Sequence, residues 1–285
     1  MILSFKPGRQ APREGLSFQA GGTMAETARG PVEYGITGQG PAVIYAHGTP
    51  GGYDQGLAFA QFISDAQCTF ISPSRPGYLR TPLSSGASPE EQADLYAALL
   101  DVLGIEQANI IGFSGGGPSA LQFALRHPTR CRGLVMIGGI VQRNCRDERL
   151  QALPPWKRAA ACFSERLLVS DSFISLVLPV TRILPAGGAV AGMLCSGTFY
   201  HLREAGYKND LAQFACIGNY PLEKISVPML VVHGMSDEDV PFEDATLLAR
   251  VVPRVTLLAL AGCDHAGFYT RARTVMPMLH EFLTS

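Results

Sequence analysis

One serine in this chain stands where a nucleophile would be expected. The residues Gly-Phe-Ser-Gly-Gly at 112–116 end a short apolar run and open a segment of helix-forming residues. A serine on such a sharp strand-to-helix turn has a crowded backbone, so the positions two residues away must be glycine. The pattern predicts Ser114 as a nucleophile whose hydroxyl projects above a sheet edge. The alternatives are a turn without chemistry and a nucleotide-binding loop, which is disfavoured because no lysine follows the glycines.

A second glycine-rich loop suits the stabilisation of negative charge. The residues His-Gly-Thr-Pro-Gly-Gly at 47–52 also follow a short apolar run. When an acyl carbonyl is attacked, its oxygen becomes negative and needs backbone N–H donors. We expect these donors to be the N–H groups of Thr49 and Gly115. His47 and Gly48 are predicted to brace the loop by hydrogen bonding rather than to transfer protons.

Together with Ser-Arg-Pro-Gly-Tyr at 74–78, these two motifs resemble the lid-bearing branch of the α/β-hydrolase superfamily. That branch includes carboxylesterases, proline iminopeptidases, haloperoxidase-like enzymes and carbon–carbon bond hydrolases. The resemblance extends from about residue 32 to the C-terminus, although the lid region carries no motif that matches. It implies a hydrolytic enzyme without a cofactor or a metal ion, and a chain order of serine, acid and histidine.

The acid and the base of that order can be placed on two loops. Asp237 ends the turn that follows the buried run 229–233, and Val-Pro follows at 240–241, as in the superfamily. Asp239 is the alternative acid because it lies only two residues further along. His265 lies on the loop before the C-terminal helix. That loop returns to the sheet edge, so His265 suits the role of the base. The histidines that fit this role less well are His127, His201, His233 and His280.

Elements that could position these residues alternate along the chain. Short apolar runs alternate with amphipathic segments of helical length, which is typical of an α/β fold with a mostly parallel sheet and helices on both faces. The predicted strands are 32–37, 42–46, 69–72, 109–113, 134–138, 229–233 and 255–260. The predicted helices are 57–65, 90–103, 116–126, 242–251 and 268–283. Ser88 is the expected N-cap of the second helix, with proline and two acids in its first turn.

The alternation stops between residues 141 and 225. That stretch contains helix formers, a Pro-Pro pair and a Gly-Gly pair, and no clear buried strand. We interpret it as an inserted helical lid over the carboxyl ends of the strands, where open α/β sheets bind ligands. The predicted organisation is an N-terminal extension at 1–31, an α/β-hydrolase core at 32–140 and 226–285, and a lid at 141–225.

Composition narrows the classes of partner. Of the 285 residues, 47% are apolar, which is ample for one large core, and the net charge of −1 gives no reason to bind nucleic acid or an anionic membrane. The seven cysteines include no Cys-x-x-Cys pair, so free thiols are expected rather than disulfides or a metal site. The most apolar segment, residues 167–184, is interrupted by Asp171, Pro179 and Arg182. Residues 1–23 contain no apolar run long enough for a signal peptide. We therefore expect a cytoplasmic protein without a membrane span, either a monomer or a homodimer.

The predicted activity is that of a serine hydrolase that forms an acyl-enzyme on Ser114. Apolar and aromatic residues dominate the predicted lid, which favours a small to medium, largely apolar ester, so a carboxylesterase is the first choice. The alternatives are a carbon–carbon bond hydrolase and a proline iminopeptidase-like enzyme. The latter would bind its substrate's amine with lid acids, for which the candidates are Glu165, Asp171, Glu204 and Asp210. One alternative is not an enzyme: a receptor that keeps the serine–histidine–acid triad and binds a small molecule.

Overall fold

The computed structural model describes residues 21–285 except for 64–66, 169, 172, 175 and 178–193. Within the described residues, the chain forms an eight-stranded sheet in the order β1-β2-β4-β3-β5-β6-β7-β8. The strands are β1 (Thr23–Thr27), β2 (Gly30–Gly38), β3 (Ala42–Ala46), β4 (Thr69–Pro73), β5 (Ala108–Phe113), β6 (Cys131–Ile137), β7 (Met229–Gly234) and β8 (Val255–Leu260). The pairs β1–β2 and β2–β4 are antiparallel and the other pairs are parallel. The predicted mostly parallel sheet is confirmed.

The central strands are covered on both faces. Every residue of β5 and of β7 is buried, which explains why these strands are continuous apolar runs in the sequence. Neighbouring residues of one strand belong to different cores. Ile44 of β3 packs in one apolar cluster and Tyr45 packs in the other, because successive side chains point to opposite faces.

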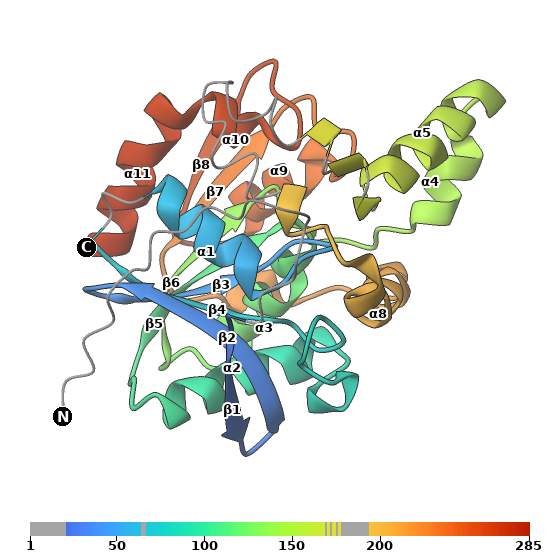
Figure 1. The fold of residues 1–285 in the computed structure, drawn as a ribbon. Coiled ribbons are helices and arrows are strands. Elements are labelled where there is room, and N and C mark those ends of the chain that lie inside the picture. Colours follow the sequence, from blue (N-terminus) through green and yellow to red (C-terminus); the bar gives the residue numbers. More distant parts are fainter. Residues whose placement is uncertain (1–20, 64–66, 169, 172, 175, 178–193) are drawn as a thin grey trace.

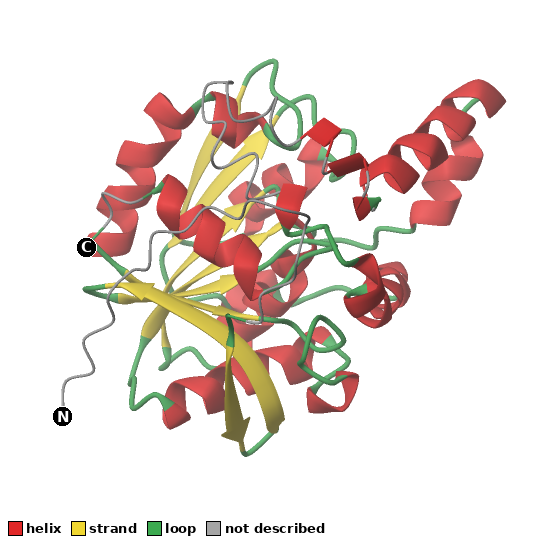
Figure 2. Ribbon diagram, viewed as in Figure 1, coloured by secondary structure: helices red, strands yellow, loops and turns green. Residues whose placement is uncertain are grey.

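Two layers of helices enclose the sheet (Figures 1 and 2). On the face of Ile44 lie α2 (Pro89–Val102), α3 (Gly117–Arg126) and α9 (Phe242–Val251). On the face of Tyr45 lie α1 (Tyr53–Phe62), α10 (Gly267–Thr270) and α11 (Ala272–Thr284). The predicted cap of α2 is confirmed, since Oγ of Ser88 accepts a hydrogen bond from the N–H of Glu91 at 3.2 Å. The sheet with its helices therefore forms the frame on which the loops of the site are mounted.

Relative to the sequence prediction, the structure adds one strand and divides one helix in two. Residues Thr23–Thr27 form β1 and pair with β2, so the end of the predicted extension 1–31 belongs to the sheet. As an edge strand, β1 buries only one of its five residues, Ala25, which leaves little apolar signal in the sequence. The predicted C-terminal helix is two helices, because the chain turns at Arg271 between α10 and α11.

Residues 141–225, called here the 141–225 segment, leave the sheet after β6 and return before β7. Their described part contains α4 (Arg146–Ala152), α5 (Pro155–Leu168) and α8 (Glu204–Ala215), and no strand. Figure 1 shows α4 and α5 side by side, extending away from the sheet, with α8 nearer to it. The interruptions noted at Pro179 and Arg182 lie outside the described residues. None of the described helices is long and apolar enough to cross a bilayer.

Candidate active site

Ser114 occupies a sharp turn between β5 and α3. Its φ of 50° lies in the left-handed region, which residues with side chains rarely adopt. The two flanking glycines are required by space. A β-carbon at Gly112 would lie 2.7 Å from Cβ of Ala120. A β-carbon at Gly116 would lie 2.1 Å from the carbonyl oxygen of Ala46. This turn therefore folds as its sequence predicts, with Ser114 at the carboxyl edge of the sheet.

Three side chains from different loops meet at this edge. Nε2 of His265 lies 2.9 Å from Oγ of Ser114, and Nδ1 of His265 lies 2.7 Å from Oδ2 of Asp237. Asp237 follows β7 and His265 follows β8, so two neighbouring strands deliver these side chains. A carboxylate can only accept, so Nδ1 carries the proton and Nε2 is free to accept from the serine hydroxyl. The structure thus brings together three residues that the sequence analysis selected separately.

Asp239, the alternative acid, lies differently. Its backbone N–H and that of Val240 each donate to Oδ1 of Asp237 at 2.9 Å, while its own side chain is exposed. The side chains of Asp237, Asp239 and His265 also offer possible metal-binding atoms within 4.8 Å of one another. Nδ1 of His265 and Oδ2 of Asp237 already bond to each other. The geometry therefore suits proton transfer better than metal binding.

The electrostatics make His265 a stronger base than an ordinary histidine. Burial lowers the pKa of His265, but the hydrogen bond and charge of Asp237 outweigh it and raise the pKa above 6.5. Burial also opposes the ionisation of Asp237, yet hydrogen bonds from His233 and His265 hold the pKa of its carboxyl well below the usual range. His233 is buried, with Nε2 at 3.0 Å from the carbonyl oxygen of Val240 and 3.3 Å from Oδ2 of Asp237. His233 thus supports Asp237 from within the core, and His265 takes the position of the base.

The loop after β3 contacts the turn that carries Ser114. A β-carbon at Gly115 would lie 2.1 Å from Oγ1 of Thr49. The N–H of Gly48 donates to Oε1 of Gln55 at 2.6 Å and is not available to a ligand. In the part of the chain that the structure describes, the N–H of Thr49 has no acceptor. The N–H of Gly115 lies in the first helical turn, where N–H groups have no intrahelical partner. Both predicted donor positions therefore border Ser114.

His47 lies at the start of the same loop and is fully buried. Its Nε2 accepts the backbone N–H of Arg75 at 2.9 Å, and its Nδ1 donates to the carbonyl oxygen of Gly48 at 2.8 Å. Burial and the nearby charge of Arg75 lower the pKa of His47 well below its usual value, so its ring is neutral. His47 thus links Gly48 of the loop to the backbone of Arg75 through its two ring nitrogens. Gln55, which also braces the loop, has no motif around it that would have indicated this role.

Side chains from the 141–225 segment also contact this loop. Asp210 on α8 accepts hydrogen bonds from Thr49, Arg75 and Tyr78, and Nη1 of Arg203 donates to the carbonyl oxygen of Gly51 at 2.6 Å. The sequence indicates Asp210 only as one acid among several in the predicted lid. Its partners lie 132 to 161 residues away along the chain, so only the folded structure could reveal them.

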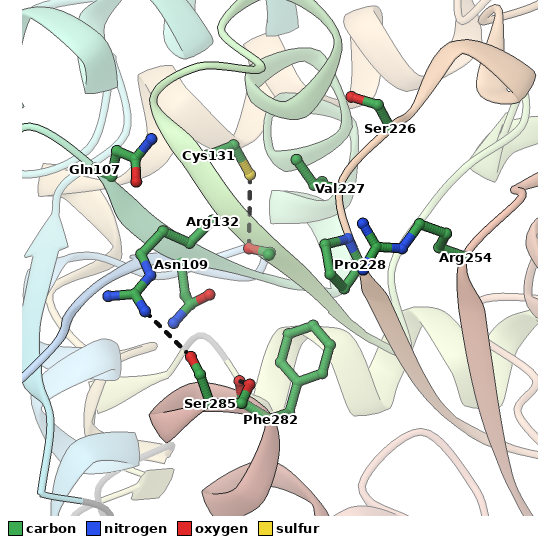
Figure 3. Close-up of a pocket in the computed structure, with 11 residues that line it drawn as sticks. Gln107, Asn109, Cys131, Arg132, Ser226, Val227, Pro228, Arg254, Phe282 and Ser285 are labelled. Carbon is green, nitrogen blue, oxygen red and sulfur yellow. Dashed lines mark hydrogen bonds between the residues drawn. The ribbon is translucent and has the colours of Figure 1, made fainter.

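A hollow of about 510 Å³ lies near the amino ends of the strands, at the end of the sheet away from Ser114 (Figure 3). Asn109 near the start of β5, Arg132 near the start of β6 and Pro228 before β7 line it. The chain end closes one side, because Nη2 of Arg132 donates to the carbonyl oxygen of Ser285 at 3.1 Å. Ligands of open α/β sheets bind at the carboxyl ends of the strands, so this hollow does not compete with the Ser114 site.

Comparisons with known proteins point to one family. Residues 41–164 match the family model described as alpha/beta hydrolase fold. A solved structure, the alpha/beta hydrolase fold protein from Nakamurella multipartita, is 33% identical, and the match covers 92% of this chain and 99% of that chain with a TM-score of 0.75. The 2-hydroxymuconate semialdehyde hydrolase of Pseudomonas putida is 26% identical over 86% of this chain and 88% of its own. The pimeloyl-[acyl-carrier protein] methyl ester esterase of Neisseria meningitidis is 29% identical over 73% and 80% of the two chains.

Proposed function

Because this chain belongs to the α/β-hydrolase superfamily, we propose that it is a serine hydrolase that cleaves a carboxylic ester. In this proposal Ser114 is the nucleophile, His265 the general base and Asp237 the acid that orients the base. The observation that carries it is the continuous line of hydrogen bonds from Asp237 through His265 to Ser114, at 2.7 and 2.9 Å. The esterase relative from Neisseria meningitidis supports the choice of an ester bond.

The proposed reaction has two halves. Nε2 of His265 takes the hydroxyl proton of Ser114 while Oγ forms a bond to the acyl carbon, and the carbonyl oxygen becomes negative. The same nitrogen then gives its proton to the leaving alcohol as the ester bond breaks, which leaves an acyl-enzyme. A water molecule repeats the sequence on the acyl group: His265 accepts its proton, and Oγ of Ser114 leaves with that proton. Asp237 stays ionised throughout and stabilises the transient imidazolium.

The N–H groups of Thr49 and Gly115 are proposed to bind the negative oxygen. Both border Ser114, and the competing N–H of Gly48 is occupied by Gln55. Donors that are fixed before the reaction need no reorganisation when charge develops, and losing one donor lowers kcat by roughly 10²- to 10³-fold. The bracing of the loop by His47 and Gln55 therefore has a chemical consequence in this proposal.

An apolar substrate group is favoured by the surroundings of Gly115. A β-carbon at Gly115 would lie 2.9 Å from Cζ of Phe214 on α8. Phe214 packs in a buried apolar cluster with Ile140, Ile217 and Val240, next to the nucleophile. The N–H of Ile140 donates to the carbonyl oxygen of Ser114 at 3.1 Å. We propose that the 141–225 segment is a cap whose apolar side chains form one wall of the substrate site.

Carbon–carbon bond hydrolysis is the second candidate, favoured by the similarity to the 2-hydroxymuconate semialdehyde hydrolase over most of the chain. An aminopeptidase is less well supported, because it needs acids free to bind an amine. The carboxylate of Asp210 is bound to Arg75, that of Asp171 accepts the N–H of Phe199 at 2.7 Å, and that of Glu204 pairs with Lys208 at 2.9 Å. The side chain of the fourth lid acid, Glu165, lies outside the described residues.

The test is a substrate panel combined with covalent labelling. Wild type should hydrolyse p-nitrophenyl esters between acetate and octanoate and should gain one phosphonyl group on Ser114 from a fluorophosphonate. Ser114→Ala should not be labelled, and its kcat should be lower by roughly 10⁶-fold. Ser119→Ala, which changes a buried serine on α3 bonded to Tyr96, is the control and should keep the label.

Three results would redirect the assignment. Ester turnover by Ser114→Ala at the wild-type rate would disprove the nucleophile. Cleavage of proline p-nitroanilide faster than any ester would favour the aminopeptidase. Negligible turnover across the whole panel, together with tight binding of a small molecule, would favour the receptor.

A further inference from the structure

We propose that the 141–225 segment positions the oxyanion donor, and that Asp210 does so by holding the side chain of Thr49. Asp210 is then a positioning residue, because it acts through Thr49 and does not touch the reacting atoms. The inference rests on the proposed function and deepens it. It assigns part of the catalytic geometry to a segment that would otherwise only shape the substrate site.

The carboxylate of Asp210 is saturated with donors. Its Oδ2 accepts from Oγ1 of Thr49 at 2.5 Å, from Tyr78 Oη at 2.5 Å and from Nη2 of Arg75 at 2.6 Å. Its Oδ1 accepts from Nη1 of Arg75 at 2.7 Å. Four bonds to one carboxylate fix its position, and they fix the Thr49 side chain with it. The adjacent N–H of Thr49 therefore has little freedom to move.

The charge pair behind this contact is almost completely removed from solvent. The side chains of Arg75 and Asp210 are 1% and 2% exposed. Burial lowers the pKa of Arg75, but the Asp210 carboxylate more than compensates and raises it above the ordinary value, so the guanidinium of Arg75 stays charged. A buried pair of this kind is weak evidence for stability, since apolar residues of the same volume often stabilise as well or better. What the pair provides is a fixed geometry at the loop.

Arg75 transmits that geometry to the rest of the loop. Its Nε donates to the carbonyl oxygen of His47 at 2.9 Å, and its Nη2 donates to Oγ1 of Thr49 at 3.0 Å. Among the described residues, Asp210 is the one carboxylate bonded to Arg75, through both Nη1 and Nη2. Asp210 lies on α8, so the 141–225 segment completes the bracing of the loop.

A second contact from the same segment holds the far side of the loop. Arg203 is fully buried, and its Nη1 donates to the carbonyl oxygen of Gly51 at 2.6 Å. Its Nη2 pairs with Asp54 at 2.7 Å, in the first turn of α1. Ser196 makes a third contact, since its Oγ accepts from Nε2 of Gln55 at 3.1 Å. The segment therefore contacts the loop on both sides of Thr49, the proposed donor.

The test is a double-mutant cycle on Thr49 and Asp210, read on p-nitrophenyl ester hydrolysis and on the rate of fluorophosphonate labelling. Thr49→Val keeps the backbone N–H and the buried charge pair but removes the hydroxyl bonded to Asp210. It should lower kcat and the labelling rate by roughly 10- to 100-fold, because small misplacements of a catalytic group have effects of this size. KM should change less than about twofold, since an oxyanion donor acts mainly on the transition state. Thr49→Ser should restore the wild-type rate.

The second arm asks whether Asp210 acts through Thr49. In the Asp210→Asn background, Thr49→Val should lower kcat little further, because the charged carboxylate that fixes the Thr49 hydroxyl is already gone. Asp244→Asn is the matched control. Asp244 is another buried aspartate. It accepts the N–H groups of Val141 and Gln142 at 2.7 and 3.2 Å, and in the described residues it shares no hydrogen-bond partner with Thr49. Its effect on kcat should multiply with that of Thr49→Val.

The outcomes separate this inference from the proposed function. Wild-type protein that neither hydrolyses esters nor takes the label overturns both. Active wild type with unchanged kcat and labelling rate in Thr49→Val overturns the inference alone, whether or not Asp210→Asn folds. Independent effects of Thr49→Val and Asp210→Asn also overturn it. A lower kcat in Thr49→Val with rescue by Thr49→Ser supports it.

Discussion

The two halves of the candidate site are held in different ways. The half that would move protons, Asp237 and His265, lies on loops of the core, and Asp237 is fixed by backbone N–H groups and by His233. The half that would stabilise the oxyanion lies on the loop around Thr49. That loop is held by side chains from distant elements, and three of them, Ser196, Arg203 and Asp210, belong to the 141–225 segment.

This difference bears on how such a fold can change its substrate. The 141–225 segment also contacts the proton-transfer half, but its hydrogen bonds there go to backbone carbonyls: Asn144 and Arg149 donate to the loop that carries Asp237. Changes in the segment should therefore disturb this half less than the oxyanion half. The same changes should reach the oxyanion half through Asp210 and Arg203. Substrate choice and transition-state stabilisation are then coupled more closely in the oxyanion half than in the proton-transfer half.

The largest effect is expected in the proton-transfer half. Asp237→Asn should lower kcat/KM by roughly 10⁴-fold, because an amide cannot favour the productive tautomer of His265. Asp239→Asn is the control and should change kcat/KM less than about threefold, since only its backbone N–H contacts Asp237. Steady-state kinetics of the two variants check this, and the reverse ranking would make Asp239 the acid.

A smaller loss of activity is expected when a single methyl group is added beside the proposed oxyanion donors. In Gly115→Ala the new β-carbon would meet Oγ1 of Thr49 at 2.1 Å and Phe214 at 2.9 Å, so the loop must shift. We expect kcat to fall roughly 10²-fold. Gly218→Ala is the matched control, because a β-carbon there has no neighbour within 4 Å. Equal kcat values for the two variants would contradict this picture of the donor site.

Loosening the far side of the loop should have a milder effect. Arg203→Lys keeps a charge but loses the planar fork that binds Gly51 and Asp54 together, so kcat should fall roughly tenfold. Arg143→Lys, which alters a solvent-exposed pair with Glu148, should change kcat less than about twofold. A change in KM without a change in kcat for Arg203→Lys would assign this arginine to substrate binding instead.

The smallest predicted effect is a shift in the pH profile, which should distinguish the two halves. The base must be neutral to act, and its pKa is raised, so kcat/KM should fall with decreasing pH through an inflection above 6.5. Removing the carboxylate in Asp237→Asn removes the main interactions that raise the pKa of His265. Burial, which lowers it, is then opposed only by the charges of Asp239 and Asp264, so the inflection should move to lower pH. Thr49→Val should leave it in place. An inflection that moves in Thr49→Val would mean that the two halves are not independent.

Much of the fold could be predicted because the central strands are buried on both faces. Continuous apolar runs such as those of β5 and β7 are unambiguous when each is followed by a helical pattern. The edge strand β1 was missed because it buries only Ala25 and is recognised mainly by its pairing with β2. The break of the C-terminal helix at Arg271 was missed for a related reason, since the apolar pattern runs on across it.

The sequence by itself determined the residues whose role depends on their immediate neighbours in the chain. Ser114 requires glycines on either side, and the strand-turn-helix pattern around it is visible in a short stretch of chain. Loop position after a strand was likewise enough to select Asp237 and His265. Only the tertiary structure decided which acid contacts the base, because Asp237 and Asp239 differ in where their side chains point.

The partners of Thr49 were decided by tertiary structure alone. Asp210 is 161 residues from Thr49 and 135 from Arg75, and no local pattern marks a buried carboxylate whose donors come from distant elements. Such contacts depend on how α8 packs against the core, which is a property of the whole chain. Nucleophile, base and acid candidates could therefore be chosen from short motifs, whereas the support of the oxyanion loop required the fold.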